Sequence, residues 1–251
     1  MDATPFSRRR AMPSEKIVKV LLAMVLALVL GLLAATLAPV AAHSIKDKGE
    51  LDRLMGDKEK YFQPLDKNAQ DFTLQNADGK VVSRTDLGGK VVVLHFIYAG
   101  CPDVCPLHAD RIAEIQEMVN QTPMKEQVQF ITITTDPEND TPDVLRAYGP
   151  AHGLDPVNWV FLTTTPDQPE DATRRLAEVY GHKFTKTEDG YQVHSVVTHV
   201  FDRQGRWRAN FHGLRFEPTN LVLFINALVN ETDKPHGHDK QGLWDKIKGL
   251  F

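Results

Sequence analysis

Two cysteine side chains, Cys101 and Cys105, are the residues whose type and spacing point most directly to chemistry. They are the only cysteines in 251 residues, so a framework of several disulfide bonds is excluded. A spacing of four residues places both sulfurs on one side of a helical turn. Such a pair can cycle between dithiol and disulfide, bind a soft metal ion such as Cu(I), or fill space as two small buried side chains.

The segments around the pair indicate that it lies at the start of a helix. Residues 90–98 form a continuous apolar run, which is typical of a central strand covered on both faces. From residue 107 to 119, apolar residues recur with helical spacing. Free N–H groups and the positive end of the helix dipole stabilise a thiolate at such a position. We therefore expect an acidic, reactive cysteine between this strand and this helix.

The rest of the sequence alternates between strand and helix patterns. Further strands are expected at 72–79, 81–82, 128–134, 159–162, 193–201 and 207–211, and further helices at 141–149, 170–180 and 220–229. The last two strands form a hairpin around 202–205, which would make the sheet mixed. Together they predict a three-layer α/β domain over residues 62–231, in an order that resembles a thioredoxin-like domain.

Two thiolates make an incomplete metal site, so a third ligand is expected among the ten histidines. His194 is favoured, because the loop before the last hairpin lies beside the cysteine turn in a thioredoxin-like domain. One imidazole with two thiolates suits both oxidation states of copper. His108 is either an auxiliary ligand or a solvated helix residue. His95 is expected to be a hydrogen-bonded core histidine, and His199 a packing residue.

The first 61 residues are expected to export and anchor the domain. Residues 20–42 carry no charge, and this stretch is long enough to cross a bilayer with about 30 Å of hydrocarbon. The basic flank, residues 1–19, would remain in the cytoplasm, which places the domain in the bacterial periplasm. An inner-membrane anchor is favoured over a signal peptide cleaved after Ala42, which would leave a soluble periplasmic domain. Residues 43–61 are polar and are expected to form a tether.

The last segment, residues 232–251, is expected to be a polar linker followed by a short amphipathic helix. Its apolar residues fall on one helical stripe: Leu243, Trp244, Ile247, Leu250 and Phe251. This stripe could lie on a membrane surface, dock on a partner or pack on the domain itself. His236 and His238 in the linker could hold a weakly bound metal ion or be solvated.

Composition narrows the classes of function. The chain is 42% hydrophobic and 25% charged, which is near the globular average. Its net charge of −4 argues against a nucleic-acid partner, which usually requires a basic surplus.

Three segments resemble the Sco (SenC) family of copper proteins, which help to assemble cytochrome c oxidase. They are 90–106, which contains Cys-Pro-Asp-Val-Cys-Pro, 135–142, which contains Asp-Pro, and 193–205, which begins Val-His-Ser. The resemblance implies a metallochaperone that binds one copper ion, as Cu(I) or Cu(II), through Cys101, Cys105 and His194. It also implies delivery of copper to the binuclear centre of the oxidase subunit, reduction of that subunit's cysteines, and contact with other copper chaperones.

The resemblance assigns roles to residues around the ligands as well. Asp103, between the cysteines, would tune the site electrostatically, and Asp136 and Pro137 would shape a nearby loop. The sequence departs from the usual family residues at Ala99-Gly100, Asn139, Val193 and His199. None of these departures removes a ligand.

A different class of function remains open, namely a thiol–disulfide oxidoreductase of the exported compartment without a metal role. It would need Cys101 and Cys105 but not His194. A metallochaperone would not be an enzyme, and it would need His194 as a metal ligand. Dependence of the protein's function on His194 therefore separates the two hypotheses.

Overall fold

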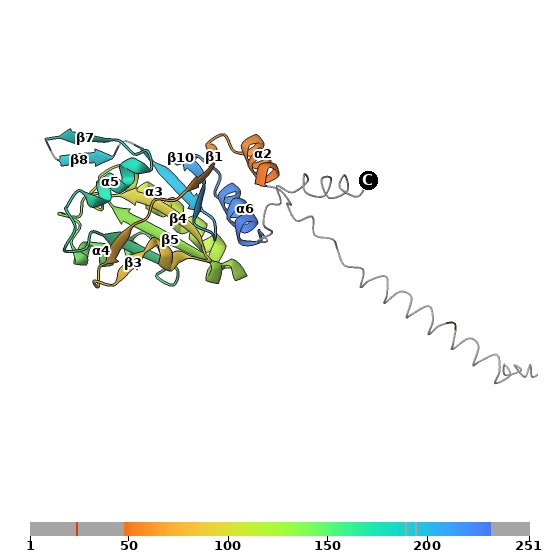
Figure 1. Cartoon of the computed structure of the whole chain (residues 1–251), viewed down its shortest axis with the longest axis horizontal. Coiled ribbons are helices and arrows are strands. Elements are labelled where there is room, and N and C mark those ends of the chain that lie inside the picture. The colour runs from red at the N-terminus through yellow and green to blue at the C-terminus, as the bar shows by residue number, and fades with distance from the viewer. Residues whose placement is uncertain (1–23, 25–47, 189, 194, 232–251) are drawn as a thin grey trace, which may run out of the picture. The chain divides into compact units, whose positions relative to one another are not determined.

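A mixed eight-stranded sheet forms the centre of the domain, in the order β1-β10-β9-β4-β5-β6-β2-β3 (Figure 1). The computed structural model describes residues 48–188, 190–193 and 195–231, together with Met24. The strands of this sheet are β1 (Phe62–Asn68), β2 (Thr73–Asn76), β3 (Val81–Ser83), β4 (Val91–Ile97), β5 (Val128–Thr134), β6 (Trp159–Thr163), β9 (Val197–Phe201) and β10 (Arg206–His212). A separate hairpin consists of β7 (Phe184–Thr187) and β8 (Gly190–Val193).

Helices and short 3-10 turns connect these strands. The helices are α2 (Lys48–Lys58), α3 (Val104–Asn120), α4 (Pro142–Ala151), α5 (Ala172–Val179) and α6 (Pro218–Val229). The 3-10 turns are η1 (Arg84–Leu87) and η2 (Pro123–Gln127).

Strand β4 lies at the middle of the sheet, and every one of its residues is buried. It pairs in parallel with β5 and antiparallel with β9, as the apolar run and the closing hairpin predict. A continuous apolar sequence fits this position because both faces of a central strand are covered. The strand therefore holds its carboxyl end, where the cysteine turn begins, in a fixed place.

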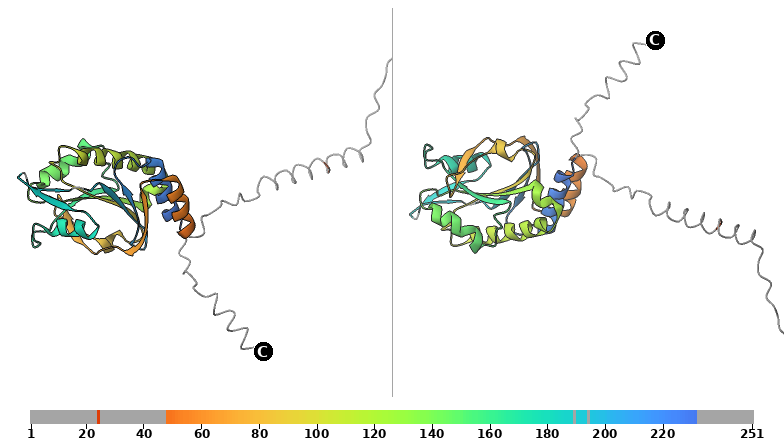
Figure 2. Two further views of the ribbon diagram at one scale, coloured as in Figure 1. Left: turned by 90° about the horizontal axis from the view of Figure 1, so that it is seen from above. Right: turned by 90° about the horizontal axis from the view of Figure 1, so that it is seen from below.

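Two apolar cores lie on opposite faces of the sheet, so the domain has three layers (Figure 2). On one face, Val93 and Ile97 of β4 share a core with Ile112 and Ile115 of α3 and with α6. On the other face, Val92, Leu94 and Phe96 share a core with Leu176 of α5. The alternation follows from the two-residue period of a strand. This arrangement confirms the predicted three-layer α/β architecture.

The folded region begins earlier than residue 62, within the segment expected to be a tether. Helix α2 occupies Lys48–Lys58, and its Leu51 and Met55 are buried in the core that α6 also lines. The Glu59 carboxylate, just after α2, accepts hydrogen bonds from the backbone N–H of Glu217 and the side chain of Asn220. Two apolar residues one helical turn apart are enough to dock this otherwise polar helix.

The strand expected at 193–201 also differs from prediction. Strand β9 begins only at Val197, whereas Val193 ends β8 in the separate hairpin. The segments FTKT and GYQV are short and mostly polar, so the sequence does not predict β7 and β8. The edge strand β1, with the sequence FQPLDKN, lacks a regular alternation of apolar and polar residues, so the sequence does not predict it.

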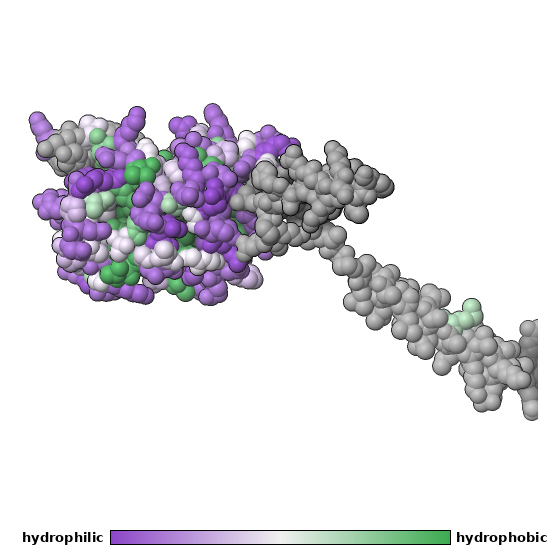
Figure 3. Space-filling view, viewed as in Figure 1, coloured by the Kyte–Doolittle hydropathy of each residue, from purple (hydrophilic) through white to green (hydrophobic). Residues whose placement is uncertain are grey.

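The predicted hydrophobic helix at 20–42 lies outside the described residues, apart from Met24, and so does the predicted amphipathic helix within 232–251. No helix among the described residues is long and apolar enough to span a membrane. The face of the domain in Figure 3 is largely hydrophilic, with apolar side chains in small patches, as is usual for a folded domain in water.

Candidate metal centre

The two cysteines occupy the turn between β4 and α3. Cys101 follows the end of β4, and its backbone N–H donates to the Tyr98 carbonyl at 3.2 Å. Cys105 lies in the first turn of α3, after Asp103 at the N-cap. Both are free thiols, 8% and 5% exposed. The structure thus confirms that the pair lies at a strand-to-helix junction, although each sulfur is more enclosed than the sequence alone indicates.

The surroundings shift the pKa values of the two thiols in opposite directions. Burial alone would raise the pKa of Cys101, but hydrogen bonds to its sulfur from the backbone of Asp103, from Cys105 and from Tyr98 lower it overall. Burial raises the pKa of Cys105 strongly, and the neighbouring Cys101 and Asp140 add to the rise. Cys101 is therefore the thiol that ionises first, as expected at a helix N-terminus.

Asp140 supports the cysteine turn from the loop after β5. Its two carboxylate oxygens accept the backbone N–H of Ala99 at 3.2 and 3.0 Å, and the Thr134 hydroxyl donates to it as well. Burial raises the pKa of this carboxyl group despite these hydrogen bonds. The sequence motif at 135–142 predicts that Asp136 and Pro137 shape a loop near the site. The contact with the cysteine turn is made by Asp140.

Asp136 acts within its own loop. Its backbone carbonyl accepts the N–H groups of Asn139 and Asp140, and its carboxylate accepts the Asn139 side-chain amide. Asn139, one of the departures from the family pattern, therefore helps to close the loop that carries Asp140.

Two tyrosines flank the thiols. The Tyr98 side chain is hydrogen-bonded to Cys101, and burial together with this contact raises the pKa of Tyr98 to about 12. The Tyr148 hydroxyl, from α4, donates to the Cys105 carbonyl at 3.4 Å, and burial raises the pKa of Tyr148 too. Both side chains stay protonated near neutral pH, so they act as hydrogen-bond donors. No spacing pattern in the sequence points to either residue.

His108 lies inside the domain and not on a solvated helix face. It is 2% exposed, its Nε2 lies 2.9 Å from the Thr198 hydroxyl, and its ring centroid lies 4.7 Å from that of His95, with the two rings tilted by 54°. Burial lowers its pKa well below the usual value, so it is neutral. His95 is fully buried beside the Thr132 hydroxyl at 3.3 Å, which confirms the prediction of a hydrogen-bonded core histidine.

His199 lies on the face of the sheet opposite to His95 and His108. Its hydrogen bonds define which of its ring nitrogens carries the proton. Asn210 Oδ1 accepts from Trp207 Nε1 at 2.9 Å and lies 2.7 Å from His199 Nδ1, while Asn210 Nδ2 donates to Gln63. An amide oxygen can only accept, so His199 Nδ1 carries the proton and donates it. Nε2 of His199 is then a hydrogen-bond acceptor.

The same reasoning extends this network towards the cysteines. His182 Nε2 lies 2.9 Å from His199 Nε2 and must donate to it, which leaves His182 Nδ1 as the acceptor for the Ser195 hydroxyl at 3.3 Å. Both histidines are buried, and burial lowers the pKa of His182 to about 4. This chain of buried imidazoles fixes Ser195, the residue that follows His194 in the sequence.

The predicted third ligand, His194, lies outside the described residues, as do His236 and His238. Its neighbours Ser195 and Val196 line a small pocket together with Cys105 and His108. Within the described ranges, no group of three or more His, Cys, Asp or Glu side chains could hold a metal ion. The residues that follow His194 nevertheless lie beside Cys105.

Comparisons with known proteins agree with this architecture. The SCO1/SenC family model matches residues 62–230. A SCO2-like protein of Rickettsia prowazekii is 29% identical over 143 residues, which cover 56% of this chain and 67% of the relative. A SCO1 protein homolog of Bacillus subtilis is 35% identical over 100 residues, which cover 40% of this chain and 51% of the relative.

Solved structures share the fold. A SCO1/SenC family lipoprotein from Bacillus anthracis is 25% identical with a TM-score of 0.59, covering 66% of this chain and 97% of that one. ScoI of Bradyrhizobium japonicum, solved with copper bound, is 28% identical with a TM-score of 0.53, covering 64% of this chain and 99% of that one. The predicted thioredoxin-like α/β fold is thus confirmed, and the chain belongs to the SCO1/SenC family.

Proposed function

We propose that this chain is a copper metallochaperone that holds one copper ion between Cys101, Cys105 and His194. The observation that carries the proposal is the buried cysteine pair at the β4–α3 junction, where Cys105 lies beside Ser195 and Val196. Two thiolates and one imidazole are a donor set that suits copper in both oxidation states. Copper is the cargo here, and a site with three protein ligands leaves room for an incoming ligand from the acceptor.

Different residues of the chain would act at different steps of copper loading. Cys101, whose pKa is lowered, would provide the first thiolate for an arriving ion. Cys105, whose pKa is raised, would give up its proton as the metal binds, so binding couples to proton release. Tyr98 and Asp140 keep the turn in shape while the metal enters or leaves.

The acceptor we propose is the subunit of cytochrome c oxidase that carries the binuclear copper centre. Support comes from BsSco, a member of the Sco family of cytochrome c oxidase assembly proteins, whose solved structure is 24% identical to this chain with a TM-score of 0.59. Incoming thiolates of the acceptor would displace Cys101 and Cys105 one at a time. Contact with other copper chaperones would supply the ion.

The unequal thiols favour a second function, reduction of a partner's disulfide. The Cys101 thiolate would attack a sulfur of that disulfide, and the partner's other sulfur would leave as a thiolate. Cys105 would then pass its proton to the thiolate that has left and attack the Cys101 sulfur. This breaks the mixed disulfide, releases the reduced partner and leaves a Cys101–Cys105 disulfide. An external dithiol must supply two electrons to restore the pair.

We further propose that residues 20–42 anchor the domain in the inner membrane, with residues 1–19 in the cytoplasm and the domain in the periplasm. The uncharged length of 20–42 and the basic flank support this orientation. A signal peptide cleaved after Ala42 is the alternative. Mass spectrometry of the N-terminus of the mature protein distinguishes the two, because cleavage would leave His43 as the first residue.

Copper titration of residues 43–251 under reducing, anaerobic conditions tests the metal proposal. We expect one copper ion per chain to survive desalting, and much less in Cys101→Ser or Cys105→Ser. A disulfide-reduction assay with His194→Ala tests the second function, because thiol exchange needs the cysteines but not the imidazole. Equal copper retention by wild type and both cysteine variants would contradict the proposed site.

A further inference from the structure

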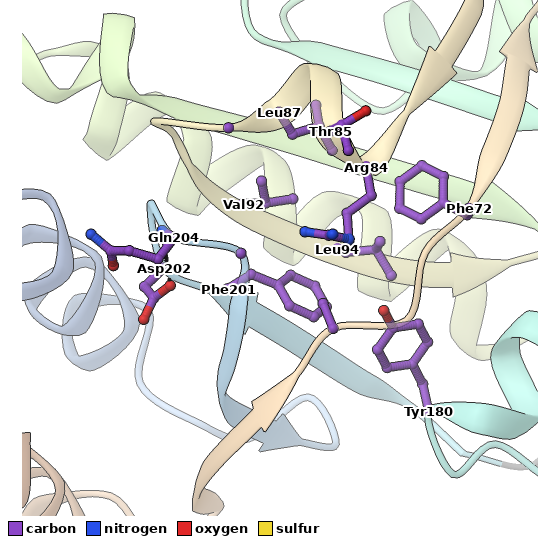
Figure 4. A pocket seen from close by; sticks show the side chains of 13 residues that line it. Phe72, Arg84, Thr85, Leu87, Val92, Leu94, Tyr180, Phe201, Asp202 and Gln204 are labelled. Atoms are coloured by element: carbon purple, nitrogen blue, oxygen red, sulfur yellow. Dashed lines mark hydrogen bonds between the residues drawn. The ribbon is translucent and has the colours of Figure 1, made fainter.

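A cavity of about 220 Å³ lies at the opposite end of β4 from the cysteines. Its walls come from the first half of β4, the end of β9, η1 and the segment before β2, and Figure 4 shows their side chains converging on one space. The apolar part of the lining consists of Phe72, Leu87, Val92, Leu94 and Phe201. Copper ligands of the proposed site are absent from this lining, so the cavity is a separate feature.

Water is a poor occupant of such a space. A buried water molecule needs several polar partners, and an apolar cavity that offers few of them stays dry. The pocket opens to solvent on one side, so a molecule from solution can reach its apolar walls. A cavity of about 150 Å³ lined by apolar side chains accepts benzene, so this larger one has room for a six-membered ring with a short substituent.

Arg84 brings a positive charge to this apolar space. Its Nε bonds Asp71 Oδ1 at 2.5 Å, and Figure 4 shows its side chain extending over Leu94 towards Phe201. Nη1 lies against Gly205, where a Cβ atom would come within 2.5 Å of it. Within the part of the chain that the structure describes, Nη1 and Nη2 of Arg84 have no hydrogen-bond acceptor.

The other polar groups of the lining do not neutralise this end of Arg84. The Tyr180 hydroxyl is hydrogen-bonded to the backbone of Gln70. The buried carboxylate of Asp202 accepts the N–H groups of Gln204 and Arg206 and pairs with Arg208. The two terminal nitrogens of Arg84 therefore form a planar fork, the geometry that binds a carboxylate through two parallel hydrogen bonds.

We propose that this pocket binds a small aromatic carboxylate, with the ring between Phe72, Leu94 and Phe201 and the carboxylate on Nη1 and Nη2 of Arg84. Asp71 keeps its contact with Nε, so the ligand completes the ion pair without displacing it. The ring fills the apolar volume, and the carboxylate of the ligand stays at the mouth of the pocket. This binding is independent of copper.

Benzoate is the probe, and benzyl alcohol is a neutral molecule of similar shape. Both are titrated into the full chain while NMR follows the methyl signals of Val92 and Leu94, which line the cavity. We expect saturable shifts with benzoate and binding at least tenfold weaker with benzyl alcohol. Arg84→Gln should weaken benzoate roughly 10- to 100-fold, the usual effect of losing a charged hydrogen-bond donor, and leave benzyl alcohol unchanged.

Three further variants separate binding at this site from other effects. Leu87→Trp should narrow the cavity and weaken the shifts from both probes. Arg146→Gln removes an exposed arginine of α4 that pairs with Asp78 and Asp143, and it should bind benzoate as wild type does. If Arg84→Gln does not fold, Arg84→Lys keeps the charge without the fork and should bind with intermediate strength. Absence of a saturable shift in wild type, or equal benzoate affinity in wild type and Arg84→Gln, overturns the proposal.

Discussion

Both carboxylate oxygens of Asp140 accept the backbone N–H of Ala99, at 3.2 and 3.0 Å. Asp140 belongs to the loop after β5, whereas Ala99 begins the turn that carries Cys101. The contact joins two loops at the carboxyl ends of neighbouring parallel strands, β4 and β5. The position of the first cysteine is thus set by a residue 39 positions later in the chain.

Removing this contact should loosen the site. Asp140→Ala leaves the Ala99 N–H and the Thr134 hydroxyl without their acceptor, which should cost about 1–3 kcal/mol of unfolding free energy. Asp140→Asn keeps one oxygen for Ala99 and should cost less. Urea unfolding at pH 7 measures both variants, and copper retention should fall in the same order. If Asp140→Ala proves as stable as wild type, Asp140 does not support the turn.

The two thiols should react at different rates with an alkylating agent. Because the pKa of Cys101 is lowered and that of Cys105 raised, iodoacetamide at pH 7.5 should modify Cys101 at least tenfold faster. Mass spectrometry of the modified peptides gives both rates in one sample. In guanidinium chloride the environments are lost, so the two rates should converge there. Faster modification of Cys105 in the folded protein would reverse the assignment.

Stability should fall in mild acid because of the buried histidines. Burial, followed by the charges of nearby histidines, lowers the pKa of His95 to about 3, and burial lowers that of His182 to about 4, against 6.5 for the unfolded residue. Between pH 6.5 and 4 the unfolded chain therefore binds protons that the folded chain does not. Each such histidine lowers the unfolding free energy by about 1.4 kcal/mol per pH unit in that window.

Unfolding by urea between pH 4.5 and 7.5 measures this slope. The His95→Gln variant lacks one titrating group. Below pH 6.5 its unfolding free energy should therefore depend less steeply on pH, by the contribution of one proton. The variant also removes Nδ1 of His95, a buried atom without a hydrogen-bond partner in the described chain. A slope that is flat in wild type, or identical in the variant, would rule out His95 as a contributor.

Gly149 should tolerate no side chain. A Cβ atom there would lie 2.3 Å from the Trp159 ring, whose Nε1 donates to the Thr132 hydroxyl beside His95. Gly149→Ala should therefore destabilise the fold by about 1–3 kcal/mol, as overpacking does. Gly56→Ala is the matched control, because a Cβ atom at Gly56 in α2 meets nothing within 4 Å. Alanine there should stabilise by about 0.5–1 kcal/mol. Thermal unfolding compares the two variants, and equal effects would contradict this packing.

Features set by local pattern could be predicted from the sequence, and features set by tertiary contacts could not. The continuous apolar run predicts β4 because a central strand is buried on both faces. Helix α2 and strand β1 are mostly polar. Helix α2 docks through Leu51 and Met55, and β1 is held by its backbone pairing with β10, and no local period reveals either contact.

The same division applies to the site. The cysteine pair follows from its spacing and its position before a helix, and the motif at 135–142 points to a loop nearby. That Asp140 makes the contact, and that His108 is buried against Thr198, depends on how distant strands pair. The chain of imidazoles from His199 to Ser195 passes through His182, in the segment between α5 and β7, and no helical or strand period links these positions.

Copper binding by His194→Ala tests the central claim most directly. The reduced chain, residues 43–251, and this variant are titrated with copper under anaerobic conditions, and bound copper is measured after desalting. We expect one ion per chain in wild type and a weakened or lost ion in the variant, while thiol counts stay equal. If both proteins retain copper equally, or neither retains it, His194 is not a ligand and thiol–disulfide exchange becomes the better account.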